Sequence, residues 1–254
     1  MKMSAEGNAI KAVIFDLDDT LISEYEFVAS GYAFVSERLE KRLDHKAAEI
    51  EARLWELSKE TYSNAFNRLF DSYGISYTKE EIRELILAYR NHPAATRFYP
   101  DAPGTLKALK ERKILTGIIS DGDPGRQRNK ISSAIDGMTG DHAFASDEAD
   151  SPVDYWFDEI ILNDEFGGAL YRKPNPKGFY EMASRLGVDP SEMIYVGDNP
   201  AKDFHISADL PVRTARIIRE NGIYIDRDYL DGIRETWRIE KLPDVISIVD
   251  GEIS

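Results

Sequence analysis

Short apolar runs that end in polar residues recur along the chain. The first run, AVIF at residues 12–15, is apolar at every position, as expected for a strand buried on both faces of a parallel sheet. Runs of similar character occupy 114–120, 157–162 and 193–198. A fifth run at 212–218 alternates between apolar and polar residues, which predicts an edge strand with one wetter face.

Helical patterns separate these runs. They occupy residues 102–112, 125–135, 176–186 and roughly 201–208. The third helix is well delimited, because Asn175 is a candidate N-cap, Pro176 fits the first helical position and Gly187 follows the end. Strands that alternate with helices predict βαβ crossovers. The fold class is therefore α/β, a three-layer core with a parallel sheet between helices.

Residues 22–96 interrupt this alternation. They contain no convincing strand, and apolar residues such as Val28, Tyr32 and Val35 recur at helical spacing. Thr78 begins a capping-box pattern before another amphipathic stretch. We expect a separate helical domain at 22–96, whose aromatic stripes form its own core. Residues 1–21 and 97–254 then make up the α/β core domain.

Two stretches carry weaker patterns. Residues 136–153 have no period and are rich in Asp, Ser and Gly, which predicts a mobile loop in preference to a functional one. Beyond residue 219 apolar residues are scattered and include Trp237. We expect this C-terminal stretch to pack against the core as a short helix or turn.

Composition narrows the class of protein. A hydrophobic content of 42% with 31% charged residues is typical of a soluble globular protein, and no stretch is long enough to span a membrane. The first ten residues lack the apolar core of a signal peptide, and the absence of Cys fits a reducing compartment, so we expect a cytoplasmic protein. The net charge of −14 argues against nucleic acid or anionic lipid as a partner.

Acidic residues follow two of the predicted strands. Asp16 and Asp18 end the first run, Asp198 ends the fourth, and Asp203 comes five residues later. Each could be an ordinary turn or N-cap residue, and this alternative is strongest for Asp203. If the two strands are neighbours, the acids converge at the carboxyl edge of the sheet. Two like charges 4 Å apart repel by about 4 kcal/mol, so we expect a compensating cation, and oxygen ligands favour Mg²⁺.

A phosphate group would complete such a magnesium site, and the chain offers further contacts for it. Ser120 ends the second run with a hydroxyl, and Gly122 offers an exposed backbone N–H. Lys173 precedes a predicted helix, where it can pair with an acid and with phosphate. A solvated surface lysine is the ordinary alternative for any single Lys.

Four motifs in this order resemble those of the haloacid dehalogenase-like hydrolase superfamily. They are FDLDDTL at 15–21, Ser120 at the end of a strand, Lys173 in RKPNP at 172–176, and GDNPAKD at 197–203. The resemblance covers nearly the full chain. It implies a Rossmann-like core whose first strand is central with the fourth beside it, and it identifies the helical insert as an α-helical cap. The cap would exclude water and select the substrate.

The resemblance also implies roles for the motif residues. Asp16 would attack phosphorus to form an aspartyl-phosphate, and Asp18 would act as general acid and then as general base. Asp18 must then hold a proton near neutral pH, so we expect its neighbours to raise its pKa. Halide leaves without a general acid, so an Asp at position 18 favours phosphate transfer over dehalogenation.

The remaining motif residues would bind metal and phosphate. Mg²⁺ would be held by Asp16, the backbone carbonyl of Asp18 and Asp198, while Ser120, Gly122 and Lys173 contact the phosphate. Asp203 would orient Lys173 or a metal-bound water. Arg126 and Arg128 could add positive potential at the rim, although we expect them to be exposed on a helix surface.

The sequence therefore predicts a Mg²⁺-dependent phosphatase that acts on a small phosphorylated metabolite, such as a sugar phosphate or a phosphoglycolate-like acid. A phosphomutase of the same fold is the first alternative. A phospho-acceptor signalling domain is disfavoured, because its acceptor acid lies on a later strand and it has no helical insert. A non-catalytic phospho-ligand-binding protein is disfavoured because Asp16, Asp18, Lys173 and Asp198 are all present.

Overall fold

Two compact units make up the chain. The computed structural model describes residues 9–138, 152–220 and 222–253. Met1–Glu24 and Thr96–Ser254 form one unit, and Tyr25–Ala95 form the other. The loop expected at 136–153 falls mostly on residues 139–151, which lie outside the described residues. Among the helices of the described ranges, none combines the length and the apolar character that crossing a bilayer requires.

The larger unit is built on a six-stranded parallel sheet with the strand order β3-β2-β1-β4-β5-β6. The strands are β1 Ala12–Phe15, β2 Leu115–Ser120, β3 Glu159–Leu162, β4 Met193–Gly197, β5 Arg213–Ile217 and β6 Trp237–Ile239. The first strand is therefore central, between β2 and β4. This is the adjacency on which the predicted convergence of acids depends.

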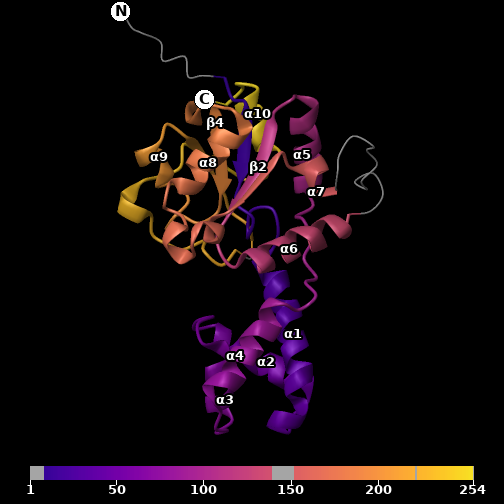
Figure 1. The fold of residues 1–254 in the computed structure, drawn as a ribbon. Coiled ribbons are helices and arrows are strands. Elements are labelled where there is room, and N and C mark those ends of the chain that lie inside the picture. The colour runs from indigo at the N-terminus through magenta and orange to yellow at the C-terminus, as the bar shows by residue number, and fades with distance from the viewer. Residues whose placement is uncertain (1–8, 139–151, 221, 254) are drawn as a thin grey trace, which may run out of the picture. The chain divides into compact units, whose positions relative to one another are not determined.

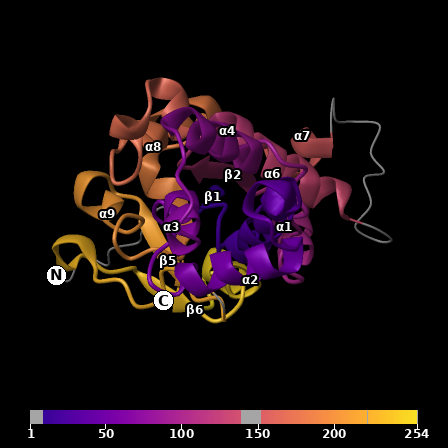
Figure 2. The same cartoon turned by 90° about the horizontal axis from the view of Figure 1, so that it is seen from below.

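Helices cover both faces of the sheet. The helices of this unit are α5 Ala102–Glu111, α6 Pro124–Asp136, α7 Pro152–Trp156, α8 Lys177–Leu186, α9 Ile206–Asp209 and α10 Asp244–Val249. Helices α5, α6 and α10 pack on one face, and α8 and α9 on the other. Figures 1 and 2 show the sheet between these two groups. The three-layer, Rossmann-like α/β fold predicted from the sequence is confirmed.

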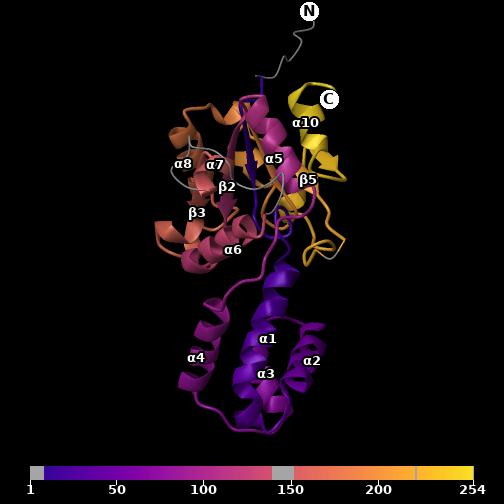
Figure 3. The ribbon, with the colours of Figure 1, turned by 90° about the vertical axis from the view of Figure 1, so that its right-hand side faces the viewer.

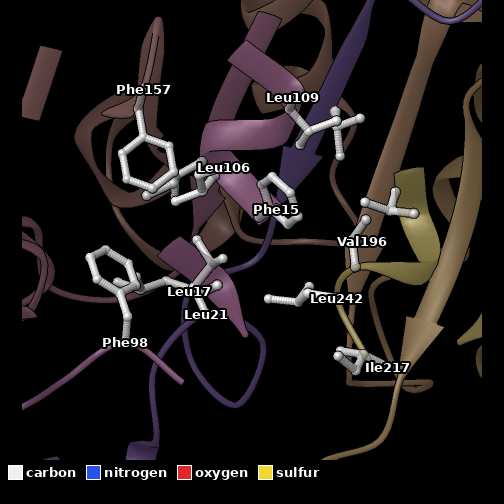
Figure 4. Packing of buried hydrophobic residues seen from close by; sticks show 14 of the residues in the cluster. Phe15, Leu17, Leu21, Phe98, Leu106, Leu109, Phe157, Val196, Ile217 and Leu242 are labelled. Carbon is white, nitrogen blue, oxygen red and sulfur yellow. The ribbon is translucent and has the colours of Figure 1, made fainter. Parts of the chain in front are cut away.

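The central strand is buried on both sides, as its uniformly apolar sequence requires. Val13 and Phe15 belong to the core under α5, whereas Ala12 and Ile14 belong to the core under α8. Figure 4 shows Phe15 among the side chains that α5 contributes. Alternate residues of a strand point to opposite faces, so a polar residue anywhere in β1 would face one of the two cores. The first polar position, Asp16, consequently comes where the strand ends.

The C-terminal stretch differs from its prediction. Trp237–Ile239 form β6, which pairs in parallel with β5 through Ala215 and Trp237. The run predicted as an edge strand is therefore internal, and the expectation of only a helix or turn after residue 219 is wrong for β6. Arg216, one of the polar residues that suggested a solvent-exposed face, is only 4% exposed. Its guanidinium donates to Tyr229 Oη and to a backbone carbonyl.

Two helix boundaries also differ from the sequence pattern. Helix α8 begins at Lys177 with Pro176 as N-cap, and Asn175 Oδ1 accepts a hydrogen bond from the Lys177 N–H at 2.9 Å. Its end is as predicted, because Gly187 has a positive φ of 66°. The helix expected at roughly 201–208 is confined to Ile206–Asp209, since turns occupy residues 201–205.

The smaller unit is entirely helical in its described part. It contains most of α1 Glu24–Leu43, followed by α2 Ala47–Ser58, α3 Ala65–Ser72 and α4 Lys79–Arg90 (Figure 3). Its apolar residues, including the Val28, Tyr32 and Val35 stripe, form a core of their own. Thr78 Oγ1 accepts from the Glu81 N–H and caps α4.

A partly buried ion pair ties together the loops at the carboxyl edge of the sheet. Arg219, just beyond β5, donates to both carboxylate oxygens of Asp101 at 2.9 and 3.0 Å and to the Thr20 carbonyl at 2.8 Å. Asp101 also accepts from the Leu242 N–H. Burial acts to raise the pKa of Asp101, but the bonds from Arg219 and Leu242 outweigh it and lower the pKa.

This ion pair gives the first prediction. Asp101→Asn should lower the free energy of unfolding at pH 7 by about 1–3 kcal/mol, since charge-assisted bonds are lost. The folded-state pKa is lowered, so the stabilisation is complete above the unfolded pKa of about 3.9 and disappears as pH falls through the folded value. Urea denaturation from pH 7 to 3 should show wild type and variant converging only at the acidic end.

A matched control is available on the surface. Asp250 makes a similar bidentate contact with Arg112, but both side chains are more than a third exposed. Asp250→Asn should cost less than about 1 kcal/mol. Equal losses of unfolding free energy in the two variants would contradict a stabilising role for the Asp101–Arg219 pair. So would a loss in Asp101→Asn that grows on acidification.

Candidate active site

The acids after β1 and β4 meet at the carboxyl edge of the sheet. The Asp16 N–H donates to the Val196 carbonyl at 2.8 Å, which extends the β1–β4 pairing to the catalytic candidate itself. Ser120 ends β2 on the other side of β1, and Lys173 lies in the loop between β3 and α8. The four sequence motifs thus converge, although they are spread over nearly 190 residues.

Lys173 stands between two of the acids. Its Nζ lies 2.7 Å from Asp16 Oδ1 and 3.0 Å from Asp203 Oδ1, and its side chain is fully buried. It also donates to the Tyr195 hydroxyl. Burial acts to lower the pKa of Lys173, but the surrounding carboxylates outweigh it and raise the pKa. Lys173 is therefore a permanent cation here, and a solvated surface lysine is excluded.

A second lysine, absent from the sequence prediction, reinforces this charge. Lys202 Nζ lies 3.0 Å from Asp121 Oδ2 and 4.0 Å from Asp16 Oδ2. Asp121 also accepts from Asn163 Nδ2 and from the Lys173 N–H. Burial would raise the pKa of Asp121, but the two lysines lower it to about 2. Lys202 lies inside the GDNPAKD motif. The acids of that motif, Asp198 and Asp203, are the only feature of the sequence that points to a role for it in the site.

Asp16, Asp198 and Asp203 form a buried carboxylate cluster. One oxygen of each lies within 4.8 Å of the others. Burial raises the pKa of Asp16 to about 6, against the opposing effect of Lys173 and Lys202. Burial together with repulsion from Asp203 and Asp16 raises the pKa of Asp198 well above its usual value. Among the residues described, no ion pair or hydrogen-bond donor reaches the Asp198 carboxylate.

These observations fit a divalent cation. Oxygen ligands from several carboxylates are what Mg²⁺ prefers, and a cation would offset the burial and the repulsion that raise the pKa values of Asp16 and Asp198. Asp203 contributes less freely, because its Oδ1 faces Lys173 and its Oδ2 accepts from the Asn199 N–H at 2.9 Å. The residues present therefore suit a metal held chiefly by Asp16 and Asp198.

Asp18 belongs to a different network. Its Oδ1 lies 2.7 Å from Lys130 Nζ, and its Oδ2 accepts from Gln127 Nε2 at 2.9 Å. Burial would raise the pKa of Asp18, but Lys130, Glu24 and Gln127 outweigh it and lower the pKa. The expectation that neighbours raise this pKa is wrong. Its cause is a buried lysine 112 residues away in the sequence, which no local pattern reveals.

Glu24 shares the same lysine. Lys130 forms an ion pair with Glu24 Oε2, and the Nζ group is fully buried between the two acids. Burial and repulsion from Asp18 raise the pKa of Glu24 to about 7. Of the two acids, Asp18 therefore ionises more readily than Glu24. Glu24 and Lys130 were not among the sequence candidates, because neither lies in a motif.

The two phosphate-binding candidates on the β2 loop are already engaged. Ser120 Oγ accepts from Gln127 Nε2 at 2.7 Å. The Gly122 N–H, expected to be exposed, instead donates to Asp164 Oδ1 at 3.2 Å. Asp164 in turn forms a bidentate ion pair with Arg172. The Gly122 N–H is therefore not open in this structure, because the loop after β3 places an acid over it.

A cavity of about 280 Å³ opens beside these residues. Its lining carries charges of both signs: Asp16, Asp18, Glu24 and Asp121 with Arg126, Arg172, Lys173 and Lys202, together with Gly122, Asn199 and Tyr224. Ser120 and Asp203 do not line it, and each is at most 1% exposed. The concentration of cations in a chain of net charge −14 satisfies the condition for binding an anion.

The two arginines of α6 have different environments. Arg128 is exposed and pairs with Glu165, as expected for a helix surface. Arg126 instead lines the cavity, so the expectation of an exposed side chain is wrong for it. Tyr224 also lines the cavity, but the sequence does not predict this because the residue lies in the irregular stretch after β5. Spacing on α6 distinguishes the arginines only once the face that turns to the site is known.

Comparison with known proteins agrees with this geometry. Residues 10–204 match a family model described as haloacid dehalogenase-like hydrolase. The glyceraldehyde 3-phosphate phosphatase of Methanopyrus kandleri is 32% identical over 86% of this chain and 88% of its own. The protein of the same name from Methanocaldococcus jannaschii is 29% identical over 94% of this chain and 97% of its own.

Solved structures lead to the same fold. The crystal structure of a HAD phosphatase from Thermococcus onnurineus superposes with a TM-score of 0.59 at 25% identity. The comparison covers 95% of this chain and 99% of that one. Both units of the present chain are thus included in the similarity.

Packing around Asp121 gives a prediction about stability. A Cβ built on Gly178, in the first turn of α8, would lie 2.2 Å from Oδ1 of Asn163, the residue that donates to Asp121. Gly178→Ala should therefore lower the free energy of unfolding by about 1–3 kcal/mol. Gly104 occupies the first turn of α5 with nothing within 4 Å of such a Cβ. Gly104→Ala should raise stability by up to about 1 kcal/mol.

Urea denaturation of the two variants checks this pair. Both substitutions add the same methyl group to the first turn of a helix, so helix propensity alone predicts shifts of the same sign. Shifts of the same sign would therefore show that the space beside Asn163 is not closed as described.

Proposed function

Because the chain belongs to the haloacid dehalogenase-like hydrolases and is a hydrolase of phosphate esters, we propose that it is a Mg²⁺-dependent phosphatase that works through an aspartyl-phosphate. The observation that carries this proposal is the position of Asp16. It ends the central strand, pairs with Lys173 at 2.7 Å and shares a carboxylate cluster with Asp198. By the same resemblance, Tyr25–Ala95 serves as the cap domain.

In the first step an Asp16 oxygen attacks phosphorus, and the bond from phosphorus to the ester oxygen breaks. The ester oxygen departs with the electron pair and takes a proton from Asp18. Lys173 and Lys202 lie beside Asp16 and offset the charge that the phosphoryl group brings. Mg²⁺, held by Asp16, Asp198 and the backbone carbonyl of Asp18, would neutralise charge that develops on the phosphoryl oxygens.

Asp18 enters this cycle ionised, because Lys130 and Gln127 both donate to it. A phosphate ester that arrives in the cavity brings negative charge, which raises the pKa of a nearby carboxylate and favours uptake of a proton. In the second step water attacks phosphorus while Asp18 accepts its proton, the Asp16–phosphorus bond breaks, and inorganic phosphate leaves.

The substrate class follows from the cavity and the relatives. A space of about 280 Å³ lies near the lower end of small-molecule sites and fits a small phosphorylated metabolite. Two relatives that span 86% and 94% of this chain carry the name glyceraldehyde 3-phosphate phosphatase. We therefore propose a three-carbon phosphate as the first substrate to test, with phosphoglycolate as the closest alternative in size.

A substrate panel tests this function. Phosphate release should require Mg²⁺ and should be fastest with glyceraldehyde 3-phosphate or phosphoglycolate. Asp16→Asn should lower kcat by about 10⁴-fold or more, because the attacking oxygen is lost. Asp209→Asn, an exposed acid on α9, should leave the rate unchanged. Conversion of a hexose 1-phosphate to its 6-phosphate without phosphate release would identify a phosphomutase instead.

The metal can be tested without turnover. Mg²⁺ at 10–100 times its dissociation constant should stabilise the wild type by about 1–3 kcal/mol and raise Tm accordingly. In Asp198→Asn this increase should vanish, and without metal the variant should be at least as stable as the wild type, since a repelled buried carboxylate has been removed. A Mg²⁺-dependent rise in Tm that persists in the variant, at constant ionic strength, would place the metal elsewhere.

A further inference from the structure

Gln127 connects two groups of the candidate site that come from different strands. It lies on α6, is fully buried, and belongs to none of the sequence motifs. Its Nε2 donates to Ser120 Oγ at 2.7 Å and to Asp18 Oδ2 at 2.9 Å. One amide nitrogen therefore joins the hydroxyl proposed to bind phosphate to the carboxylate proposed to move the proton.

The direction of these bonds has a consequence for Ser120. An amide NH₂ group has two protons, and both acceptors lie at hydrogen-bonding distance. A carboxylate only accepts, so the amide must present nitrogen to Asp18, and the opposite orientation would set two oxygens against each other. Ser120 Oγ then accepts from Gln127, and its own proton is left to point toward another acceptor.

Lys130 completes the arrangement from the same helix. Positions 127 and 130 share one face of α6, and Lys130 Nζ holds the second oxygen of Asp18 at 2.7 Å. The Asp18 carboxylate is thus fixed at both oxygens by donors from a single helix. Rotation of this carboxylate would break at least one charge-assisted bond.

The amide oxygen of Gln127 argues against a purely structural role. Oε1 is buried and has no hydrogen-bond partner among the residues described. An unsatisfied buried acceptor is unfavourable, and an apolar side chain of similar volume would avoid it. What Gln127 supplies in exchange is a pair of donors aimed at Ser120 and Asp18.

We propose that Gln127 is a positioning residue, which leaves the Ser120 hydroxyl as a hydrogen-bond donor and locks the Asp18 carboxylate for proton transfer. The proposal rests on the phosphatase function given above. A phosphoryl oxygen accepts hydrogen bonds, so Ser120 can bind it only as a donor. Gln127 sets that polarity before the substrate arrives, which is preorganisation of the kind that lowers barriers in enzymes.

A double-mutant cycle tests the link between Gln127 and Ser120. Gln127→Met keeps the volume and removes both donors, and it should lower kcat/KM roughly 10- to 100-fold. Ser120→Ala should cause a loss of the same order in the wild type. In the Gln127→Met background, Ser120→Ala should lower kcat/KM less than about 3-fold further, because the hydroxyl is no longer directed.

Two further variants separate positioning from folding. Gln127→Glu has the same shape but replaces a donor by an acceptor. It should therefore lower kcat/KM more than Gln127→Met does. Arg128→Met changes the neighbouring, exposed residue of α6 and should leave kcat/KM within about 2-fold of the wild type. Circular dichroism checks that each variant is folded.

Binding of inorganic phosphate gives a readout that does not need turnover. Calorimetry with Mg²⁺ present should show weaker phosphate binding in Gln127→Met and in Ser120→Ala, but not in Arg128→Met. If the losses in the Met and Ala variants simply multiply, or if Gln127→Glu is as active as the wild type, the positioning role is wrong. A wild type without phosphatase activity would instead refute the proposed function, and the phosphate-binding cycle would still test Gln127.

Discussion

Repulsion between buried carboxylates is the constraint on which the carboxyl edge of this sheet depends. Because β1 lies between β2 and β4, Asp16 and Asp198 end adjacent parallel strands and cannot move apart without breaking the sheet. Their charges must be balanced locally. Lys173 and Lys202 do so from two different loops, and the full burial of the Lys173 side chain is tolerated only because acids surround it. The site is thus a mutual arrangement, in which neither acids nor lysines are stable alone.

The charges divide into two groups with different environments. Around Asp16 the acids outnumber the cations, and burial leaves the pKa values of Asp16 and Asp198 raised, the condition that a divalent cation relieves. Around Asp18, burial would again raise the pKa, but the Lys130 cation and hydrogen bonds with Glu24 and Gln127 outweigh it and lower the pKa. Two acids separated by one residue therefore differ in protonation behaviour. In the proposed mechanism the roles follow from position: Asp16, which pairs with Lys173 and belongs to the carboxylate cluster, attacks phosphorus, and Asp18 transfers the proton.

The sequence predicted the parts of this structure that local pattern determines. Largely apolar runs predicted β1, β2 and β4. Asp16 and Asp198, which follow β1 and β4, had to meet because these two strands are neighbours. Strand β6 was missed because three residues carry no period of their own and pair only when β5 is in place. Lys130 and Gln127 were missed because polar residues on a helix look solvent-exposed until the packing of α6 is known.

Sequence motifs alone do not determine the hydrogen bonding and charge of such a site. The four motifs supply groups of the right chemistry, but the proton on Ser120 and the charge on Asp18 depend on a helix that contains none of them. A chain could keep every motif residue and still lose the directed hydroxyl through one change on α6. Conversely, Oε1 of Gln127 has no hydrogen-bond partner among the described residues, whereas its nitrogen serves two acceptors, Ser120 and Asp18. In this fold the sheet brings the candidate groups together, and α6 supplies the donors that contact Ser120 and Asp18.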